Sequence, residues 1–312
     1  MKIFLNLPSL HHMNHLGLLA ILKKLNFQLV KKIKEADIVY SPSCYLNTKK
    51  YKNKIFIFGP HFSIYPNKNS RKLSNKYGNA LYIQPSEEVV KIWSDEFSFS
   101  NLPIKPFPFP LLMENYSVSN QKKDLVLIYY KMRDPKDLQK ICEFFEKKKV
   151  TYKIIKYGSY IESDYQKLLD RSQYVFWLGC HESQGFALQA ALAKNIPVLV
   201  WSVQKLSQEW KCSPSYFSIK TKITTVPYWD DTCGLKFYNF SELEDSFEKF
   251  VSNLSNYKPR GFIEKNLSVT KCSKRFLKLI TKTRETMTIK SQELEKKSNI
   301  LEKFKTKILD IF

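Results

Sequence analysis

The first hundred residues alternate short apolar runs with segments of helical periodicity. Four apolar runs, each ended by turn residues, are typical of β-strands and cover residues 2–7, 36–40, 54–58 and 80–83. Leucine and isoleucine recur at helical spacing over residues 14–25, and Ser86 is placed to cap a helix that runs to about Trp93. Strands and helices that alternate at this length predict a parallel sheet with helices on both faces.

A proline-rich segment interrupts this pattern and predicts a linker between two domains. Residues 102–111 contain four prolines, which disfavour both a helix and a central strand. The pattern then restarts, with apolar runs at 124–130, 151–155, 174–178 and 196–201 and helical segments at 134–147, 164–170 and 185–193. We therefore expect an N-terminal domain at 1–112, a second domain at 113–280 and a helical tail at 281–312.

The expected fold class is α/β, with two Rossmann-like doubly wound domains and right-handed crossovers. Residues 204–240 are irregular and rich in aromatic side chains, whereas 241–251 and 272–282 have helical spacing. The tail is polar with a sparse apolar stripe, which indicates a solvated helix that packs through this stripe. The alternative is a basic helix that lies on a membrane surface.

The net charge of +22 raises the question of nucleic-acid binding. A basic stripe would bind phosphates in a salt-dependent way. However, the lysines are spread along the whole chain, and only six of the 51 basic residues are arginine, namely Arg71, Arg133, Arg171, Arg260, Arg275 and Arg284. Specific phosphate and base recognition relies on the planar arginine fork. We therefore expect solvated surface charge that steers anionic substrates, and no nucleic-acid partner.

Chain length, cysteine spacing and the N-terminal residues limit the class of protein. The 312 residues, 43% of them hydrophobic, suffice for two ordinary domains. Six cysteines lie far apart without a CxxC pair, which indicates free thiols rather than a zinc site or a disulfide framework. Residues 1–12 indicate a first strand rather than a signal peptide, and no apolar run approaches roughly 20 residues. The expected location is the cytoplasm, with the basic C-terminal helix offering peripheral membrane association.

The most informative segment is residues 174–201, YVFWLGCHESQGFALQAALAKNIPVLVW. Two apolar runs flank a loop that opens into a helix, and the loop holds Gly179, His181, Glu182, Gln184 and Gly185. In a doubly wound sheet, ligands bind beyond the carboxyl ends of the strands, where helix N-termini direct N–H groups at anions. A glutamate in this place can accept hydrogen bonds from sugar hydroxyls while backbone N–H groups bind a diphosphate.

This segment resembles the sugar-donor motif of GT-B glycosyltransferases of the retaining, GT4-like group. Glu182 matches the first glutamate of that motif, and its remaining matches are Gly185-Phe186, Ala191-Leu192-Ala193 and Pro197-Val198. The resemblance implies that Glu182 contacts the donor sugar and that the Gly185-Phe186 turn lies at the diphosphate. Ala190 occupies the place of the second, ribose-binding glutamate, and Gln189 is the candidate that could replace it.

Two further segments fit the same resemblance. The family places basic residues after the first strand of the second domain, where they neutralise the leaving diphosphate. Here the run at 124–130 is followed by Lys131 and Arg133, and either or both could serve. Tyr157 and Gly158 follow the next strand, where the family usually holds the nucleotide base.

The acceptor side is expected at the strand ends of the first domain. The candidates are His11, His12 and Asn14 after the first strand and His61 after the strand at 54–58. Histidine can donate, accept and titrate near neutral pH, so His61 is also the candidate catalytic residue on this side, beside Glu182 on the other. The spacing of the histidines matches no HxH or HExxH metal motif, and Asp230-Asp231 forms no DxD motif, so no bound metal is expected.

The sequence therefore predicts a glycosyltransferase that moves a hexose from a UDP- or GDP-linked donor to a glycan or other hydroxyl acceptor, with retention of configuration. No cofactor is expected beyond this nucleotide-sugar co-substrate. The alternatives are an inverting transferase or epimerase of the same fold, a degenerate domain that only binds sugars or nucleotides, and a basic nucleic-acid-binding protein. The Lys-, Asn- and Ile-rich composition is typical of a virus or bacterium with an AT-rich genome.

Overall fold

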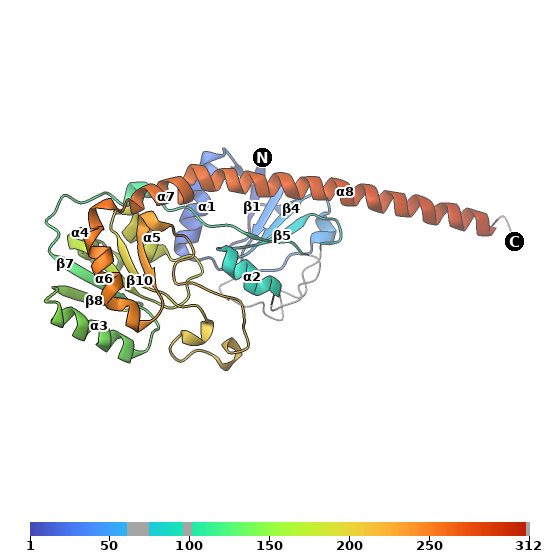
Figure 1. Cartoon of the computed structure of the whole chain (residues 1–312). Helices are drawn as coiled ribbons and strands as arrows, with labels where there is room; N and C mark the ends of the chain where they lie inside the picture. The colour runs from blue at the N-terminus through green and yellow to red at the C-terminus, as the bar shows by residue number, and fades with distance from the viewer. Residues whose placement is uncertain (61–74, 96–101, 310–312) are drawn as a thin grey trace.

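The computed structural model describes residues 1–60, 75–95 and 102–309, which form two parallel β-sheets flanked by helices (Figure 1). Within these residues the first sheet has six strands in the order β2-β1-β3-β4-β5-β6: β1 Lys2–Leu5, β2 Gln28–Leu29, β3 Ile38–Ser41, β4 Ile55–Phe58, β5 Ala80–Gln84 and β6 Ile104–Pro106. The second sheet has five in the order β11-β10-β9-β7-β8: β7 Leu125–Tyr130, β8 Tyr152–Lys156, β9 Ser172–Leu178, β10 Val198–Trp201 and β11 Gly234–Phe237. The predicted pair of doubly wound α/β domains is confirmed.

The α-helices of the described residues also follow the sequence pattern, with two differences. They are α1 His12–Lys24, α2 Glu87–Asp95, α3 Pro135–Lys147, α4 Glu162–Arg171, α5 Phe186–Ala193, α6 Leu243–Ser252, α7 Pro259–Leu267 and α8 Val269–Leu309. Helix α7 was not predicted, and neither were the short strands β2, β6 and β11. Helix α8 joins the helix expected at 272–282 and the expected helical tail in one continuous helix, because no glycine or proline occurs between its ends.

Each face of the second sheet has its own apolar core. Leu127, Tyr129 and Trp177 face helices α4, α5 and α7, and the Tyr129 and Trp177 rings stack with centroids 4.0 Å apart. Ile128 and Phe176, on the alternate positions, face α3 and α6. This alternation follows from the period of two along a strand, and it keeps both faces of the sheet out of water.

Helix α8 ties the two halves of the chain together. It starts directly after α7, and its first turns bury Cys272, Phe276 and Ile280 in the core formed by the first sheet and α1. Its next turns still lie against the first domain, with Thr286 and Lys290 beside Gly78, and its C-terminal part then projects clear of both sheets (Figure 1). The Pro-rich segment expected as a linker contains β6, a short edge strand of the first sheet, and the chain after β6 leads to β7. The domain boundaries at 112 and 280 stay a prediction.

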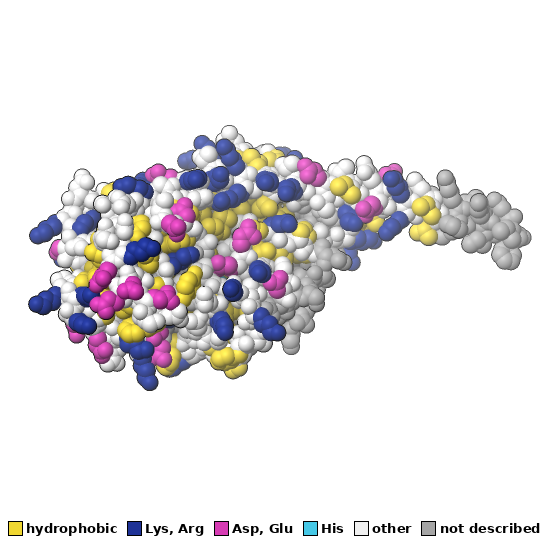
Figure 2. Space-filling model, viewed as in Figure 1, with side chains coloured by type: hydrophobic (Ala, Val, Ile, Leu, Met, Phe, Trp, Pro, Cys, Tyr) yellow, Lys and Arg dark blue, Asp and Glu magenta, His cyan; other side chains and the backbone are white. Residues whose placement is uncertain are grey.

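The basic side chains are spread over the visible surface. Figure 2 shows Lys and Arg along α8 and over both domains rather than in one stripe. In the part of the chain that the structure describes, no helix is long and apolar enough to cross a bilayer.

Candidate functional site

A buried ion pair lies at the carboxyl end of the second sheet. The Lys131 ammonium follows β7, Glu182 follows β9, and Nζ of Lys131 donates to Oε1 of Glu182 over 2.8 Å. Their side chains are only 14% and 9% exposed. Strands β7 and β9 are neighbours, so parallel pairing brings residues 51 positions apart in the sequence to the same edge. Two residues that the sequence assigned to the sugar donor are therefore in direct contact.

Aromatic side chains surround the Lys131 ammonium. It lies 4.4 Å from the ring centroid of Tyr157, the residue expected near the nucleotide base. Burial alone would lower the pKa of Lys131, but the nearby Glu182 carboxylate raises it above its ordinary value. The Tyr160 hydroxyl, hydrogen bonded to that of Tyr129 over 3.2 Å, lies near the same ammonium. Lys131 is thus a permanent cation on a surface that can stack a planar ring.

Two residues of this cluster, Cys180 and Glu209, were not named from the sequence, and His181 was named as a loop residue without a role. Cys180 and His181 precede Glu182, and Glu209 approaches from the irregular segment after β10. Burial raises the pKa of the Glu209 carboxyl and raises that of the Cys180 thiol to about 12, so the thiol stays protonated. No motif marks Glu209, because only the path of this segment across the sheet edge brings it here. We call Lys131, Tyr157, Cys180, His181, Glu182 and Glu209 the Lys131–Glu182 cluster.

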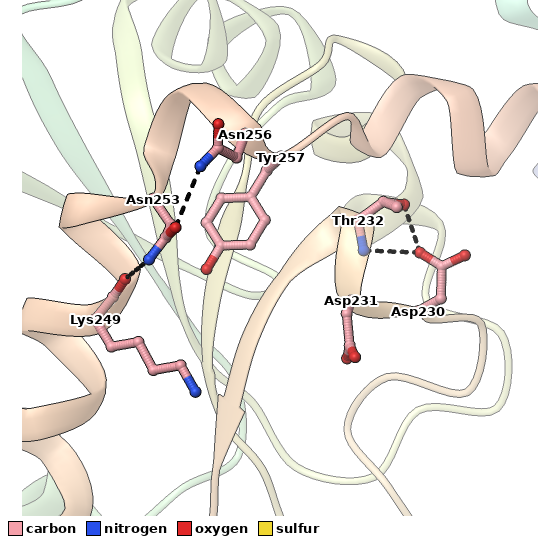
Figure 3. A pocket seen from close by; sticks show the side chains of 7 residues that line it. All are labelled: Asp230, Asp231, Thr232, Lys249, Asn253, Asn256 and Tyr257. Carbon is pink, nitrogen blue, oxygen red and sulfur yellow. Dashed lines mark hydrogen bonds between the residues drawn. The ribbon is translucent and has the colours of Figure 1, made fainter.

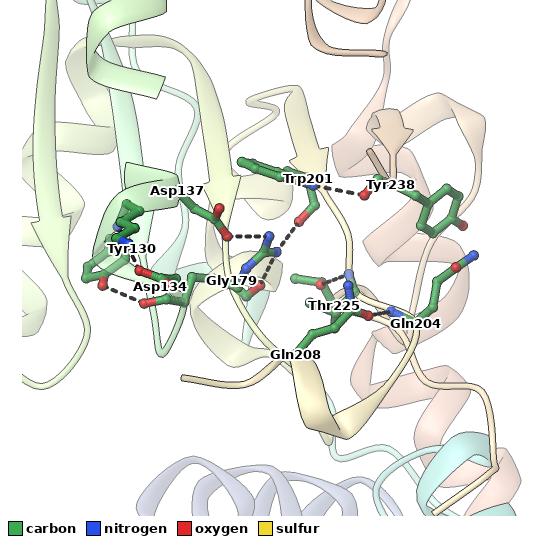
Figure 4. Close-up of polar contacts among 12 residues, drawn as sticks. Tyr130, Asp134, Asp137, Gly179, Trp201, Gln204, Gln208, Thr225 and Tyr238 are labelled. Atoms are coloured by element: carbon green, nitrogen blue, oxygen red, sulfur yellow. Dashed lines mark hydrogen bonds and ion pairs between the residues drawn. The ribbon is translucent and has the colours of Figure 1, made fainter. Parts of the chain in front are cut away.

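Arg133 has a different environment from Lys131. Met132 between them has a φ of 49°, which turns the chain sharply after β7. The Arg133 guanidinium is 3% exposed and donates to Gly179 O, Trp201 O and the Asp137 carboxylate at 3.0–3.3 Å (Figure 4). It also lies 4.7 Å from the Trp201 ring centroid. These contacts join the ends of β9 and β10 to α3, so the geometry gives no support to the expected diphosphate contact.

The turn into α5 is held by side-chain amides. Gly185 has a φ of 79°, the left-handed conformation that glycine adopts without strain, and Phe186 begins the helix. The Gln189 side chain is fully buried and donates to Gln184 O over 2.8 Å. Gln189 therefore supports the loop from inside, and the nucleotide contact expected of it finds no support in this geometry. Gly158, with a φ of 77°, lies open after β8.

The first domain reaches this turn through two contacts. The His11 ring stacks on Phe186 with centroids 5.7 Å apart and planes 3° apart. Gln184 accepts from Phe109 N over 3.0 Å and donates to Phe109 O over 2.7 Å. His12 is exposed, and Asn14 is 8% exposed with an Oδ1 that has no partner among the described residues. His61 lies outside the described residues. The expected acceptor-side residue His11 thus lies against the expected donor-side residue Phe186.

Two hollows lie elsewhere on the described surface. One, of about 580 Å³, is lined by Asp230, Asp231 and Thr232 from one side and by Lys249, Asn253, Asn256 and Tyr257 from the other (Figure 3). Asp230 accepts from Thr232 N over 2.9 Å, so it caps a turn, as expected for a loop residue. No group of three or more His, Cys, Asp or Glu side chains in the described chain could hold a metal ion.

The other hollow, of about 960 Å³, lies between α8 and the edge of the first sheet. Its charged lining residues are Glu87, Lys105, Arg275, Lys278, Lys282 and Lys290. Within the described part of the chain, no acidic group pairs with Lys105, Lys278 or Lys282, whereas Lys290 pairs with Glu293 on its own helix. We call this region the α8 hollow.

Solved structures of known proteins share this architecture. WaaB, the lipopolysaccharide outer core galactosyltransferase, has 13% identity over 90% of this chain and 99% of its own, with a TM-score of 0.51. TarM has 16% identity over 84% of this chain with a TM-score of 0.48, and the chain spans 58% of its length. WaaG, a glycosyltransferase involved in lipopolysaccharide biosynthesis, has 9% identity over 88% of this chain and 98% of its own, with a TM-score of 0.43. No protein family model and no curated protein sequence matches the chain.

WaaB is a GT-B glycosyltransferase, and the likeness to it shows that the chain has the GT-B fold of two Rossmann-like domains. The fold implied by the residues around Glu182 is thereby confirmed. Membership of the GT4-like retaining group stays a prediction.

Proposed function

We propose that this protein is a glycosyltransferase that moves a hexose from a UDP- or GDP-linked donor to a hydroxyl acceptor, with retention of configuration. The observation that carries the proposal is the Lys131–Glu182 ion pair, buried at the carboxyl end of the second sheet and beside the turn into α5. In doubly wound sheets this edge is the ligand-binding edge. The fold shared with the galactosyltransferase WaaB supports the same reaction class.

In this proposal Lys131 leaves Glu182 and pairs with the diphosphate when the nucleotide sugar binds. Charge builds on that diphosphate as its bond to the sugar breaks, and a preorganised ammonium stabilises it. Glu182, released from the ion pair, accepts hydrogen bonds from the sugar hydroxyls. Tyr157 is placed to stack on the base, since its ring already lies against the Lys131 ammonium. Arg133 acts by holding the strand ends that position Lys131.

The acceptor side of the proposal rests on the contact between the domains. His11 stacks on Phe186, so a hydroxyl acceptor held near His11, His12 and Asn14 would approach the sugar donor from the first domain. In the retaining mechanism the leaving diphosphate takes the acceptor proton, and no protein nucleophile is needed. We expect no requirement for a divalent metal, because Lys131 supplies the positive charge at the diphosphate.

The α8 hollow supports a second part of the proposal, which is peripheral association with an acidic membrane surface. Its cations outnumber its one acidic side chain, and α8 continues from it as a projecting helix with exposed Ile289, Ile300 and Leu301. Lysines that flank apolar side chains are typical of interfacial helices. All six cysteines are free thiols, which suits the reducing cytoplasm as the place of action.

The decisive experiment is a panel of UDP- and GDP-linked hexoses with the free diphosphates, followed by thermal shift and by hydrolysis of the donor. Wild type should be stabilised by one nucleotide class and should hydrolyse the nucleotide sugar of that class. Lys131→Met should lower donor hydrolysis about 100-fold or more, since one electrostatic contact in a buried site commonly contributes that much. Because this change leaves Glu182 without its partner, the double variant Lys131→Met/Glu182→Gln tests the same loss in a neutral site.

Lys194→Met is the matched control. Lys194 also forms an ion pair, with Asp170 at 2.8 Å, and its side chain is 5% exposed at the far end of α5. Its loss should lower the melting temperature without changing nucleotide selectivity. If no nucleotide stabilises wild type at millimolar concentration, the proposal fails and a degenerate sugar-binding domain becomes the better account. Nucleotide binding without hydrolysis or transfer would support that same alternative.

A further inference from the structure

His181 is a buried side chain whose ring nitrogens have no partner in the part of the chain that the structure describes. It lies in the loop between β9 and α5, one residue before Glu182, and is 5% exposed. Among the described residues, neither Nδ1 nor Nε2 of its ring has a hydrogen-bond partner. Buried side-chain nitrogens are nearly always paired in folded proteins, so two unpaired nitrogens on one ring require an explanation.

The rest of the loop does not share this feature. Gln184 pairs its amide with the backbone of Phe109 in both directions, and Gln189 pairs with Gln184 O. The loop is therefore well matched to its protein surroundings except at the one ring that adjoins the Lys131–Glu182 pair. A group that binds to this cluster is therefore a candidate for the partner of this ring.

The chemistry of the ring selects the kind of partner. Burial, with a smaller effect of the Lys131 ammonium, lowers the pKa of His181 to about 3, so the ring is neutral at physiological pH. A neutral imidazole has one N–H donor and one acceptor nitrogen. A hydroxyl group can satisfy either nitrogen, because it donates and accepts. Ionised phosphate oxygens only accept, so they could pair only with the ring N–H, and in the function proposed above Lys131 pairs with them.

We propose that His181 is a specificity-determining residue that hydrogen bonds a hydroxyl group of the donor sugar held beside Lys131 and Glu182. This inference rests on the glycosyltransferase function proposed above and assigns to His181 the sugar, not the nucleotide. A donor that lacks the contacted hydroxyl leaves a buried nitrogen unpaired and is disfavoured.

The test measures, by calorimetric titration, the affinity of wild type and of His181→Phe for a nucleotide sugar and for the corresponding free nucleoside diphosphate. The probes are UDP-glucose with UDP and GDP-mannose with GDP. The affinity of His181→Phe for the nucleotide sugar should fall about tenfold or more, while its affinity for the free diphosphate stays at the wild-type value. The melting temperature without ligand should not fall, since the change removes unpaired buried nitrogens. His181→Asn, which keeps a donor and an acceptor, should recover part of the loss and serves if the Phe variant does not fold.

Tyr40→Phe is the matched control, because the Tyr40 hydroxyl is also fully buried and unpartnered in the described chain but lies in the first sheet. It should leave both affinities unchanged. Equal losses for sugar and diphosphate, or none for either, would overturn the role of His181 alone. If wild type binds neither kind of ligand, the proposed function fails and takes this inference with it.

Discussion

The charged side chains at the carboxyl end of the second sheet differ from those on the α8 side of the first domain in whether they have partners. At the sheet edge, Lys131 is paired with Glu182, and the Arg133 guanidinium is satisfied by two carbonyls and Asp137. On the other side, Lys278 and Lys282 line the α8 hollow without an acidic partner in the described residues. Placement, and not the number of charges, therefore distinguishes the candidate active site in this very basic protein.

A carboxyl group on the same side of the first domain extends the contrast. Glu88 in α2 lies against the segment before β11 of the second domain, where it accepts from the Thr224 backbone N–H. Its Oε2 atom is buried without a hydrogen-bond partner in the described chain. Burial raises the pKa of Glu88 to about 7, with smaller opposing effects of Thr224 and Lys236. Charged groups that have a partner should thus contribute to stability. Charged groups that lack one should lower the stability or bind a ligand.

The largest expected effect on stability comes from removing a matched charge. Arg133→Met should lower the free energy of unfolding by about 2–4 kcal/mol, because it leaves two buried carbonyls unpaired and removes the cation from Trp201. Arg133→Lys should not restore it, since an ammonium lacks the planar fork that reaches Gly179, Trp201 and Asp137 together. Urea denaturation measures both variants.

Arg171→Met is the control for this change. Arg171 pairs with Asp124 over 2.7 Å, but the two side chains are 45% and 40% exposed, so little stability should be lost. An equally small loss for Arg133→Met would mean that the matched contacts at the sheet edge are not worth more than a surface pair.

The fold could be predicted largely from the sequence, because its main signal is local. Within the run at 124–130, residues 125–130 are all apolar, as a strand buried on both faces requires, and they form β7. Strand β11 was missed because only four residues, starting at Gly234, pair with β10 after a long irregular segment. The helix expected at 272–282 and the helical tail expected after it were described separately because they differ in polarity. They form one helix, α8, because a continuous backbone helix needs only the absence of a breaker.

The candidate site could be predicted only where strand ends bring it together. Lys131 and Glu182 were both placed at strand ends, and the adjacency of β7 and β9 joins them. Which way a side chain turns after a strand is not a local property, so Arg133 was grouped with Lys131 although it points into the strand ends. The contact of His11 with Phe186 depends on how the two domains pack, and the sequence pattern carries no signal for it.

The second-largest expected effect on stability concerns the carboxyl group of Glu88, and it depends on pH. The folded-state pKa of Glu88, about 7, lies above its ordinary value of 4.5, so the folded protein binds more protons between these values and loses stability as pH rises through them. Glu88→Gln removes this loss. The variant should be more stable than wild type by on the order of 1–2 kcal/mol at pH 8 and similar to it at pH 4. Glu87→Gln, an exposed neighbour on α2, should run parallel to wild type. If the curve of stability against pH for Glu88→Gln also ran parallel to that of wild type, burial would not destabilise the charged form of this carboxyl group.

The smallest effect on stability, and the sharpest test of the comparison, concerns the unpaired lysines of the α8 hollow. Lys278→Glu/Lys282→Glu should leave the melting temperature unchanged, because neither lysine has an acidic partner to lose among the described residues. Binding to phosphatidylcholine vesicles that contain phosphatidylserine should weaken about tenfold or more, since each basic residue near an acidic surface contributes about 1 kcal/mol. Wild-type binding should also weaken with added salt.

Lys140→Glu/Lys147→Glu changes the net charge by the same amount on α3 of the second domain, where both lysines are exposed. If the two double variants lose vesicle binding equally, total charge and not the α8 hollow is responsible. If wild type binds neutral and acidic vesicles alike, the lysines are solvated surface and membrane association falls away. If only Lys278→Glu/Lys282→Glu loses vesicle binding, the lysines of the α8 hollow have a specific partner, as Lys131 and Arg133 do, but this partner is the membrane surface and not a group of the protein.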